Sequence, residues 1–360
     1  MRASGVSAKP SSLRVIQWAT GNVGRSALRQ ILGHPELELV GCLVHSDEKV
    51  GKDAGELCKQ PTTGVLATAS IDEILDLQAD CVSHMPLPSA QYGDDPEADL
   101  RNICRILESG KNVVTTVGYL YPRAYGDAVF ERLQKACIAG GASLHGTGAN
   151  PGWMSDVLPL TASAMSARID RIYVRESTDF SWYPSPQVLF DLMGMGCTER
   201  EYEARAKRYI GWLSGLFRES LMLVADGLGL VLDEIAFESE FRLGDEDHEI
   251  AAGRVAKGTV AAQRFVWSGL IEKEAVIVLE AVYMTRREAA SDWPAPGFVC
   301  RVEGRPVIKF ELDEGWISNG LIATAVHAVH AIPTVCAAAP GIRTFLDLPL
   351  IVGKYTAGAR

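Results

Sequence analysis

A glycine turn near the start of the chain could hold the pyrophosphate of a dinucleotide. Residues 19–24 read ATGNVG; they follow an apolar run at 13–18 and precede an amphipathic segment and a second apolar run at 37–44. Glycine lets the main chain approach a phosphate, and the following helix turns unpaired N–H groups and a positive dipole end toward it. A plain strand, turn and helix would share part of this pattern, but the complete strand–helix–strand order favours a dinucleotide-binding unit. The predicted cofactor contacts in the turn are Thr20, Gly21, Asn22, Val23 and Gly24.

The residues after the second apolar run indicate which nicotinamide cofactor this turn serves. Folds that take NAD usually place Asp or Glu about 20 residues past the glycine turn, where it binds the ribose hydroxyls. Here His45 and Ser46 occupy that place, and the acids Asp47 and Glu48 come later. Ser46 could donate to a 2′-phosphate and His45 could lie against the adenine, so the sequence favours NADP. The alternative is that Asp47 still reaches the ribose and the cofactor is NAD.

Further cofactor contacts are expected where the later strands end. A parallel sheet lines its cofactor crevice with the carboxyl ends of its strands, and strands are expected at 80–84 and 111–116. The predicted contacts after these two strands are Met85, Pro86, Leu87, Thr116 and Val117.

Asn150 has two compatible roles. Its side chain suits the N-cap of a helix that begins near Met154, with Pro151 as the first helical residue. It could also present its amide to the carboxamide of the nicotinamide. We therefore count Asn150 among the predicted cofactor-binding residues.

Two side chains are candidates for proton transfer. Tyr119 follows the strand at 111–116 and could donate a proton to a carbonyl or imine, although a tyrosine in this place also serves as pocket wall. Glu176 ends a later strand and is followed by Trp182 and Tyr183. This mixture of carboxylate and aromatic residues suits either a small substrate pocket or an edge strand with a packed turn.

The elements that must position these residues change character along the chain. Strands and helices alternate through the first 150 residues, which is typical of a doubly wound parallel sheet of the Rossmann type. Later segments are rich in β-branched residues, and 258–286 is typical of two adjacent antiparallel strands. A second, α+β domain on an antiparallel or mixed sheet is therefore expected. Its strands are predicted at 168–176, 234–243, 249–254, 258–268, 274–286 and 297–312.

Two helices complete the predicted organisation. One is expected within 199–231, and the apolar helix at 319–338 is expected to pack back on the first domain. We predict a dinucleotide-binding domain, a substrate-binding and dimerisation domain, and a flexible tail. Their bounds are 13–155 with 320–360, 156–319, and 1–12 respectively.

Composition narrows the class of partner and the compartment. The 360 residues carry a net charge of −10 with 22% charged residues, which argues against nucleic acid or an anionic membrane as the main partner. The eight cysteines are scattered, as expected for reduced thiols in a cytoplasmic protein. His327 and His330 could form a metal pair, but no third ligand is evident, so we interpret them as core histidines and expect no metal site.

Several segments taken together resemble one enzyme family. The chain is similar to the native amine dehydrogenases and the 2,4-diaminopentanoate dehydrogenases, whose N-terminal domain resembles dihydrodipicolinate reductase. The resemblance covers nearly the whole chain and implies a homodimeric NAD(P)H-dependent enzyme that interconverts an amine with a ketone and ammonia. The substrate pocket would lie between the two domains. The segments that carry the resemblance are RVIQWATGNVGRSALRQIL, VGKDAGEL, GKNVVTT, GTGANPGWMSDVLPL, GTVAAQRFVW and AIPTVCAAAPGIRTFLDLP.

The chain departs from this family at two places. After GKNV-x-T the family carries a glutamate that handles the ammonia and imine protons, whereas Gly118 and Tyr119 stand at the matching positions. Loss of general acid–base catalysis typically costs about 10²–10⁴-fold in rate, so Tyr119 or Glu176 would have to supply the group. His330 stands where the family often has Asn.

The sequence thus predicts NADPH-dependent reductive amination of small ketones or aldehydes by hydride transfer to an imine. The alternatives are a carbonyl or cyclic-imine reductase that needs no free ammonia, and a non-catalytic NADPH-binding sensor. The predicted catalytic residues are Tyr119 and Glu176, and the predicted substrate pocket contains Tyr119, Trp153, Trp182, Tyr183 and His330.

Overall fold

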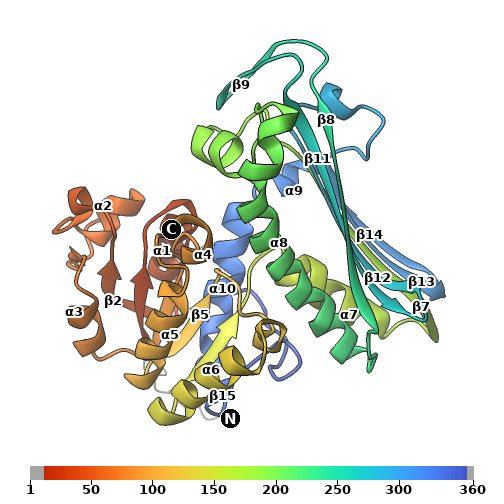
Figure 1. Cartoon of the computed structure of the whole chain (residues 1–360). Helices are drawn as coiled ribbons and strands as arrows, with labels where there is room; N and C mark the ends of the chain where they lie inside the picture. Colours follow the sequence, from red (N-terminus) through yellow and green to blue (C-terminus); the bar gives the residue numbers. More distant parts are fainter. Residues whose placement is uncertain (1–11, 355–360) are drawn as a thin grey trace, which may run out of the picture.

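The computed structural model of the chain describes residues 12–354. It contains two large sheets and a two-stranded hairpin, and the long helix α8 (Glu199–Gly227) runs between the two large sheets (Figure 1). The predicted tail falls outside the described residues except for Ser12, as do the last six residues of the predicted first domain. Within the described part of the chain, no helix is long and apolar enough to cross a membrane.

The first sheet is parallel throughout and has the strand order β15-β6-β5-β4-β1-β2-β3. Its strands are largely buried because helices cover both faces, which is why most of them are short apolar runs without regular alternation. This confirms the predicted doubly wound α/β fold. Its strands are β1 (Leu13–Trp18), β2 (Leu37–Leu43), β3 (Ala67–Thr68), β4 (Cys81–His84), β5 (Asn112–Thr115), β6 (Ser143–Gly146) and β15 (Gly341–Ile342).

Helices on the two faces enclose separate apolar cores. The helix α10 (Gly320–Cys336) lies beside α1 (Asn22–Gly33) and packs on β4 and β5, so the last long helix returns to the first sheet. On the other face, α5 (Ala98–Glu108) pairs with α6 (Asp127–Gly140). Shorter helical segments join the strands: η1 (Asp47–Lys49), α2 (Ala54–Cys58), α3 (Ile71–Asp76), α4 (Ser89–Tyr92) and η2 (Pro122–Tyr125).

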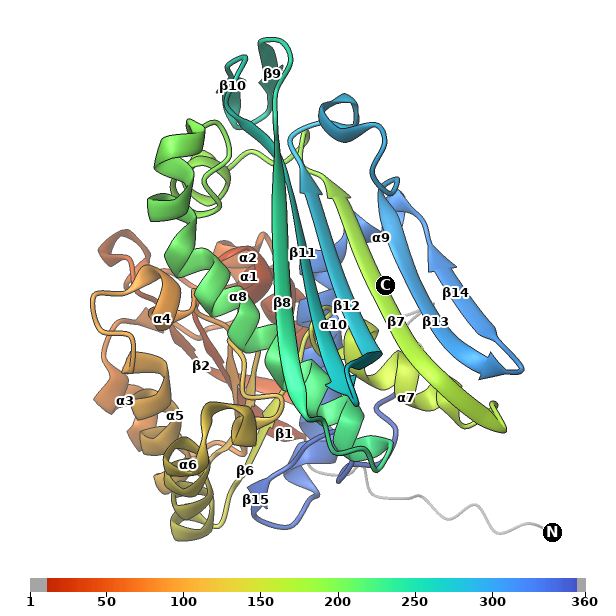
Figure 2. The same ribbon diagram turned by 45° about the vertical axis from the view of Figure 1, so that its right-hand side comes forward.

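The second sheet is mixed, with the order β14-β13-β7-β12-β11-β8 (Figure 2). Only the β12–β7 pair is parallel, because a long excursion that includes α8 separates these two strands in the chain. The predicted second domain on an antiparallel or mixed sheet is confirmed as a fold class. Its strands are β7 (Arg168–Asp179), β8 (Glu234–Leu243), β11 (Val260–Ile271), β12 (Glu274–Met284), β13 (Gly297–Arg305) and β14 (Ile308–Leu312).

Two of the predicted strands are wrong as single strands. The segment 249–254 forms a small hairpin of β9 (His248–Ile250) and β10 (Gly253–Val255), because the chain turns at Ala251 and Ala252 before Gly253 pairs with Ile250. The segment 297–312 divides into β13 and β14 at Pro306, which lacks the N–H that a continuous ladder needs. The remaining helical segments are η3 (Trp153–Val157), α7 (Leu158–Ser163), η4 (Gln187–Leu192), η5 (Arg287–Ala290) and α9 (Glu314–Ile317).

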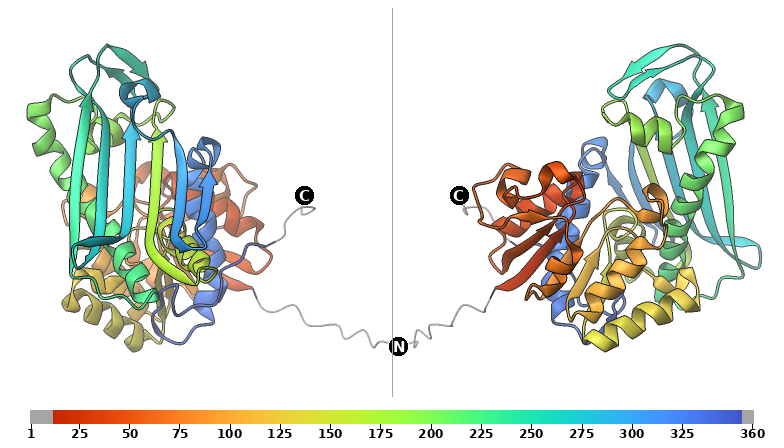
Figure 3. Two further views of the ribbon diagram at one scale, coloured as in Figure 1. Left: turned by 90° about the vertical axis from the view of Figure 1, so that its right-hand side faces the viewer. Right: turned by 60° about the vertical axis from the view of Figure 1, so that its left-hand side comes forward.

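The inner face of the mixed sheet packs on α8 and forms the largest apolar core. Inward residues alternate along the strands as the pleat requires, and the ring of Phe217 on α8 stacks on Trp267 of β11 at 4.3 Å between centroids. The opposite face of this sheet is turned to the viewer in the left panel of Figure 3. On this side the short segment η5 (Arg287–Ala290) and Trp293 cover one end of β11 and β12.

Alanine substitutions at two glycines beside the start of α1 test the close packing of the first turn. A Cβ on Gly24 would lie 2.1 Å from the carbonyl oxygen of Ala19, whereas a Cβ on Gly21 would meet no atom within 4 Å. We expect Gly24→Ala to lower the free energy of unfolding by about 2–3 kcal/mol, as overpacking does, and Gly21→Ala to lower it by about 0.5–1 kcal/mol through the poorer N-cap alone. Thermal unfolding followed by circular dichroism checks both. Equal melting temperatures for the two variants would contradict the packing argument.

Candidate active site

A cavity of about 330 Å³ lies where α8, the inner face of the mixed sheet and the turn after β6 meet. Of the predicted site residues, Asn150, Glu176, Trp182 and Tyr183 all line it, although they come from separate parts of the chain. Most of the wall is aromatic or aliphatic. Among the described residues that line it, none is lysine, arginine or histidine.

Glu176 is the carboxylate of this cavity. It lies on the inner face of β7, and its Oε1 accepts a hydrogen bond of 2.8 Å from the hydroxyl of Tyr283 on β12. Its Oε2 accepts one of 2.7 Å from the Nδ2 of Asn150. Burial raises the pKa of Glu176 above its ordinary value, while the two hydrogen bonds act in the opposite direction. A carboxylate with a raised pKa on the wall of an apolar cavity is suited to accepting and returning a proton.

Asn150 holds Glu176 and does not cap a helix. The prediction that Asn150 is an N-cap is wrong, since the helical turn begins at Trp153 and Gly152 precedes it with a φ of +132°. The Oδ1 of Asn150 accepts a hydrogen bond from the Ser155 hydroxyl while Nδ2 donates to Glu176. Both ends of the amide are therefore occupied within the cavity wall.

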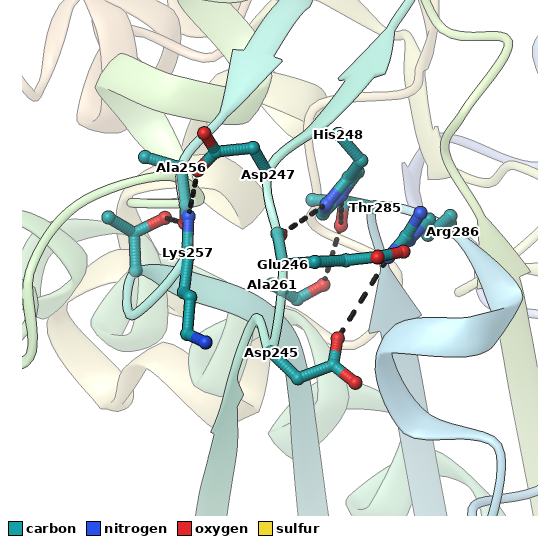
Figure 4. Close-up of polar contacts among 10 residues, drawn as sticks. Asp245, Glu246, Asp247, His248, Ala256, Lys257, Ala261, Thr285 and Arg286 are labelled. Carbon is teal, nitrogen blue, oxygen red and sulfur yellow. Dashed lines mark hydrogen bonds and ion pairs between the residues drawn. The ribbon is translucent and has the colours of Figure 1, made fainter.

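A second layer of polar contacts supports the wall that contains Trp182 and Tyr183. The β9–β10 hairpin donates from Ala251 N–H to the carbonyl of Ser181 at 2.8 Å. Figure 4 shows how the base of this hairpin is fixed: His248 bonds to the Thr285 hydroxyl, and Arg286 pairs with Glu246. The main-chain N–H of Lys257 donates to Asp247. The hairpin thus stabilises the aromatic wall from outside the cavity.

The glycine turn opens the helix α1 as predicted. Asn22 is the first residue of α1 and Gly21 its N-cap, so the first N–H groups of the helix are free to bind an anion. Ala19 adopts a φ of +74°, a left-handed conformation that the smallest side chain with a Cβ tolerates. At the end of β2, His45 and Ser46 are exposed, and the Nζ of Lys49 lies 3.3 Å from the main-chain and side-chain oxygens of Thr20.

The remaining predicted cofactor residues lie on the same edge of the parallel sheet. Met85 follows β4 and donates its N–H to the Trp18 carbonyl at the end of β1. Thr116 follows β5 and donates to the carbonyl of His84. Pro86, Leu87 and Val117 continue from these strand ends.

Three residues predicted for the substrate pocket do not line the cavity. Tyr119 lines a separate cavity of about 150 Å³ with Tyr125, because a φ of +62° turns its backbone away, and burial raises the pKa of its hydroxyl. Trp153 packs behind the wall against Trp316, at 6.3 Å between ring centroids. His330 lies on α10 about 9 Å beyond Thr324, the last residue of that helix at the cavity.

The surroundings of His330 show why the prediction failed. Its Nε2 lies 3.4 Å from the Nε2 of Gln30 on α1, and its ring is 6.0 Å from that of His34. It therefore belongs to the contact between α1 and α10. His327 bonds to the hydroxyl of Thr147 at 2.8 Å, and no group of three or more possible metal ligands occurs among the described residues.

A buried carboxylate on α8 is not among the predicted site residues. Glu219 is fully buried and accepts hydrogen bonds from the turn that follows β5. A signal for it was present, because Glu219 falls on the apolar face of its helix, three residues after Leu216 and four before Leu223, which are both buried. A charged residue on a core-facing position is rarely buried without a specific partner.

The matches to known proteins cover almost the whole chain. Residues 153–357 match the family described as the 2,4-diaminopentanoate dehydrogenase C-terminal domain, and residues 15–93 match that of the dihydrodipicolinate reductase N-terminus. An amine dehydrogenase from Streptomyces virginiae is 36% identical over 94% of this chain and 96% of its own length. The 2,4-diaminopentanoate dehydrogenase of Acetoanaerobium sticklandii is 26% identical over 69% of this chain and 70% of its own length.

A solved structure shares the fold. The amine dehydrogenase from Mycobacterium smegmatis superposes with a TM-score of 0.77 at 20% identity, covering 96% of this chain and 98% of its own. The match in sequence and the matching domain families together establish the relationship. The chain belongs to the family of the amine dehydrogenases and 2,4-diaminopentanoate dehydrogenases.

Proposed function

We propose that this protein is an NADPH-preferring amine dehydrogenase that forms an amine from a small neutral ketone or aldehyde and ammonia. The observation that carries the proposal is the Glu176 carboxylate, held between Asn150 and Tyr283 on the wall of an otherwise apolar cavity. Membership of the family supports the reaction class. The amine dehydrogenase from Streptomyces virginiae matches 94% of the chain at 36% identity.

The residues of the glycine turn fit a dinucleotide. Gly21 leaves open space above the turn, and the N–H groups at the start of α1 would receive the pyrophosphate. Met85, Pro86, Leu87, Thr116 and Val117 would line the rest of the crevice. The bound nicotinamide supplies the hydride, and the remaining steps fall to groups of this chain.

Lys49 supports the preference for NADPH. Its ammonium group lies beside Thr20, at the end of β2 where a 2′-phosphate would be bound, next to Ser46. In the ion pairs of the described residues Lys49 has no acidic partner, although Asp47 and Glu48 are close in the chain. Its charge is thus free to pair with a phosphate.

Glu176 would manage protons at the substrate carbon. Its carboxylate would take two protons in turn from the nitrogen of the attacking ammonia and pass each to the substrate oxygen, which leaves as water and yields the imine. Tyr283 and Asn150 would keep the carboxylate in one orientation through this exchange. In this proposal Tyr119 does not donate the proton, because its ring lines the separate cavity of about 150 Å³.

The wall of the cavity favours neutral substrates. A keto acid would bring a carboxylate into a space that already holds Glu176 and whose described lining carries no lysine, arginine or histidine. Burying an unpaired charge in such surroundings is strongly unfavourable. We therefore assign small apolar ketones and aldehydes as the substrate class. We propose no nucleic-acid or membrane partner.

The proposal includes a homodimer in the cytoplasm. On the outer face of the mixed sheet Glu280 is only 4% exposed and pairs with Arg264 at 2.6 Å, and the Tyr173 hydroxyl donates to the same carboxylate. Val278 and Val266 lie on this face and are part-buried. A face with a part-buried ion pair and part-buried valines suits contact with a second copy. The eight free thiols support a reducing compartment.

Replacing Glu176 tests the chemical step. We expect Glu176→Gln to lower kcat for ammonia-dependent NADPH oxidation by about 10²–10⁴-fold, as loss of a general base does, and to leave the Kd of NADPH unchanged. Tyr283→Phe keeps the carboxylate and is expected to cost at most about tenfold. The assay uses small aldehydes and ketones with and without ammonium at alkaline pH. Alcohol as the product regardless of ammonia would reject amination in favour of carbonyl reduction.

Replacing Lys49 tests the choice of cofactor. We expect Lys49→Ala to raise the Kd of NADPH by about tenfold or more through loss of a charge-assisted hydrogen bond, with little change for NADH. Lys52→Ala is the matched control, since this side chain also follows β2 but makes no contact with the turn among the described residues. Calorimetric titration with both cofactors checks this. An equal loss for NADH and NADPH would refute a role at the 2′-phosphate.

A charge on the outer sheet face tests the dimer. Val278→Arg is expected to give a particle of one chain, 38.9 kDa, where the unchanged protein gives twice that mass. Light scattering during size-exclusion chromatography measures the mass. Val231→Arg is the control, since Val231 is 83% exposed and lies outside the sheet. A dimer that persists in Val278→Arg would exclude this face.

A further inference from the structure

A carboxylate of α8 reaches across to the turn that ends β5. The Oε1 of Glu219 accepts a hydrogen bond of 3.1 Å from the N–H of Tyr119 and one of 2.7 Å from the hydroxyl of Tyr125. Its Oε2 accepts one of 2.7 Å from the N–H of Tyr121. Two main-chain groups and one side chain of the same segment thus converge on one fully buried carboxylate.

Within residues 12–354, no lysine, arginine or histidine pairs with this carboxylate. The titratable groups that face Glu219 are Tyr119, Tyr121 and Tyr125 from the turn and Asp156 from η3. Burial raises the pKa of Glu219 to about 7 and Asp156 acts in the same direction, whereas the three hydrogen bonds lower it. The hydrogen bonds from the turn therefore stabilise the anion, and the anion in return fixes the conformation of the turn.

The turn needs this support because its backbone is strained. Gly118 has a φ of +123° and Tyr119 a φ of +62°, and a tyrosine in the left-handed region is unfavourable unless its surroundings fix it. The place that a side chain on residue 118 would take is filled: a Cβ there would lie 2.9 Å from the Tyr125 hydroxyl and 3.2 Å from the Oε1 of Glu219. The carboxylate thus occupies the space beside the turn.

The helix that carries Glu219 also forms the cavity wall. Leu216, one turn earlier on α8, lines the cavity, as do Trp212 and Leu213. The turn itself continues directly from Thr116 and Val117 at the carboxyl end of β5. One rigid helix therefore joins the substrate wall to the strand end at the cofactor crevice.

We propose that Glu219 is a positioning residue for hydride transfer: its three hydrogen bonds fix the turn after β5, against which the nicotinamide half of the cofactor packs. This inference rests on the proposed function for the location of the nicotinamide. It assigns no direct contact between Glu219 and either substrate, because the carboxylate is enclosed by the turn and the helix.

Binding of a whole cofactor and of a cofactor fragment separates positioning from general stability. NADPH and 2′-phospho-ADP-ribose, which lacks the nicotinamide, are titrated calorimetrically into the full-length protein well below its melting temperature. We expect Glu219→Gln to raise the Kd of NADPH by about tenfold and to leave that of the fragment within about twofold. Equal losses for both ligands, or a lower melting temperature with both Kd values unchanged, would overturn the proposal.

Two further variants keep the test decisive. Asp226→Asn is the matched control: Asp226 is also on α8 and accepts a hydrogen bond of 3.1 Å from the Tyr121 hydroxyl, but at an exposed position. It is expected to leave both Kd values unchanged, and a selective loss of NADPH in this variant would also count against Glu219. If Glu219→Gln does not fold, Tyr125→Phe decides. It removes one donor and is expected to give a smaller but selective loss for NADPH, and no selective loss refutes the proposal.

Dependence on pH gives an independent readout. Because the pKa of Glu219 is raised, the group takes up a proton as the pH falls from 8 to 6, and a protonated carboxyl presents an O–H to one of its donors. The affinity advantage of NADPH over the fragment is expected to shrink over this interval in the unchanged protein and to stay constant in Glu219→Gln. Asp156 titrates in the same range, with a pKa of about 6, and is present in both proteins. Neither measurement requires a substrate, so failure of the amination assay would leave this result interpretable. A parallel pH response in the two proteins would contradict the inference.

Discussion

The demand that buried carboxylates be hydrogen bonded organises the centre of this molecule. Glu176, Asp156 and Glu219 are all enclosed, and in the described chain none of them pairs with a lysine or arginine. Removing a carboxylate from water costs several kcal/mol unless donors replace the lost solvent. Each of the three accepts at least one hydrogen bond from a segment that follows a strand of the parallel sheet.

The unusual backbone of these segments follows from that demand. Gly152 directs its N–H at the Oδ2 of Asp156, at 2.7 Å, from a φ of +132°. The turn after β5 directs the N–H groups of Tyr119 and Tyr121 at Glu219. Strained conformations of this kind persist only where the surroundings determine them, and here the carboxylates of Asp156 on η3 and Glu219 on α8 do so.

The sequence predicted what depends on local periodicity and missed what depends on distant partners. The turn at Gly21, the strand ends and the return of the last helix follow from short-range patterns of apolar residues and glycine. Asn150 had a sound local role as a helix cap, but its amide is used by Glu176, 26 residues away. The prediction that His330 lines the substrate pocket failed for a similar reason, because packing decides which face of α10 contacts α1. Glu219 is recognisable in the sequence as a charged residue on the apolar face of a helix, yet its hydrogen-bond partners are about 100 residues away along the chain.

The same contacts make the two halves of the chain depend on each other chemically. Glu176 and Glu219 belong to β7 and α8, while their donors Asn150, Tyr119 and Tyr121 come from segments that extend the parallel sheet. Separating the halves would leave buried anions without donors and donors without acceptors, and each unsatisfied group carries a desolvation cost of about 1–3 kcal/mol or more. The carboxylates therefore stabilise the contact between the two sheets, and they also take part in the proposed chemistry.

A family member that had its carboxylate at another position in this region would need its hydrogen-bond donors at other positions too. Gly118 fits this constraint: the absence of a side chain there leaves the space that the carboxylate of α8 fills.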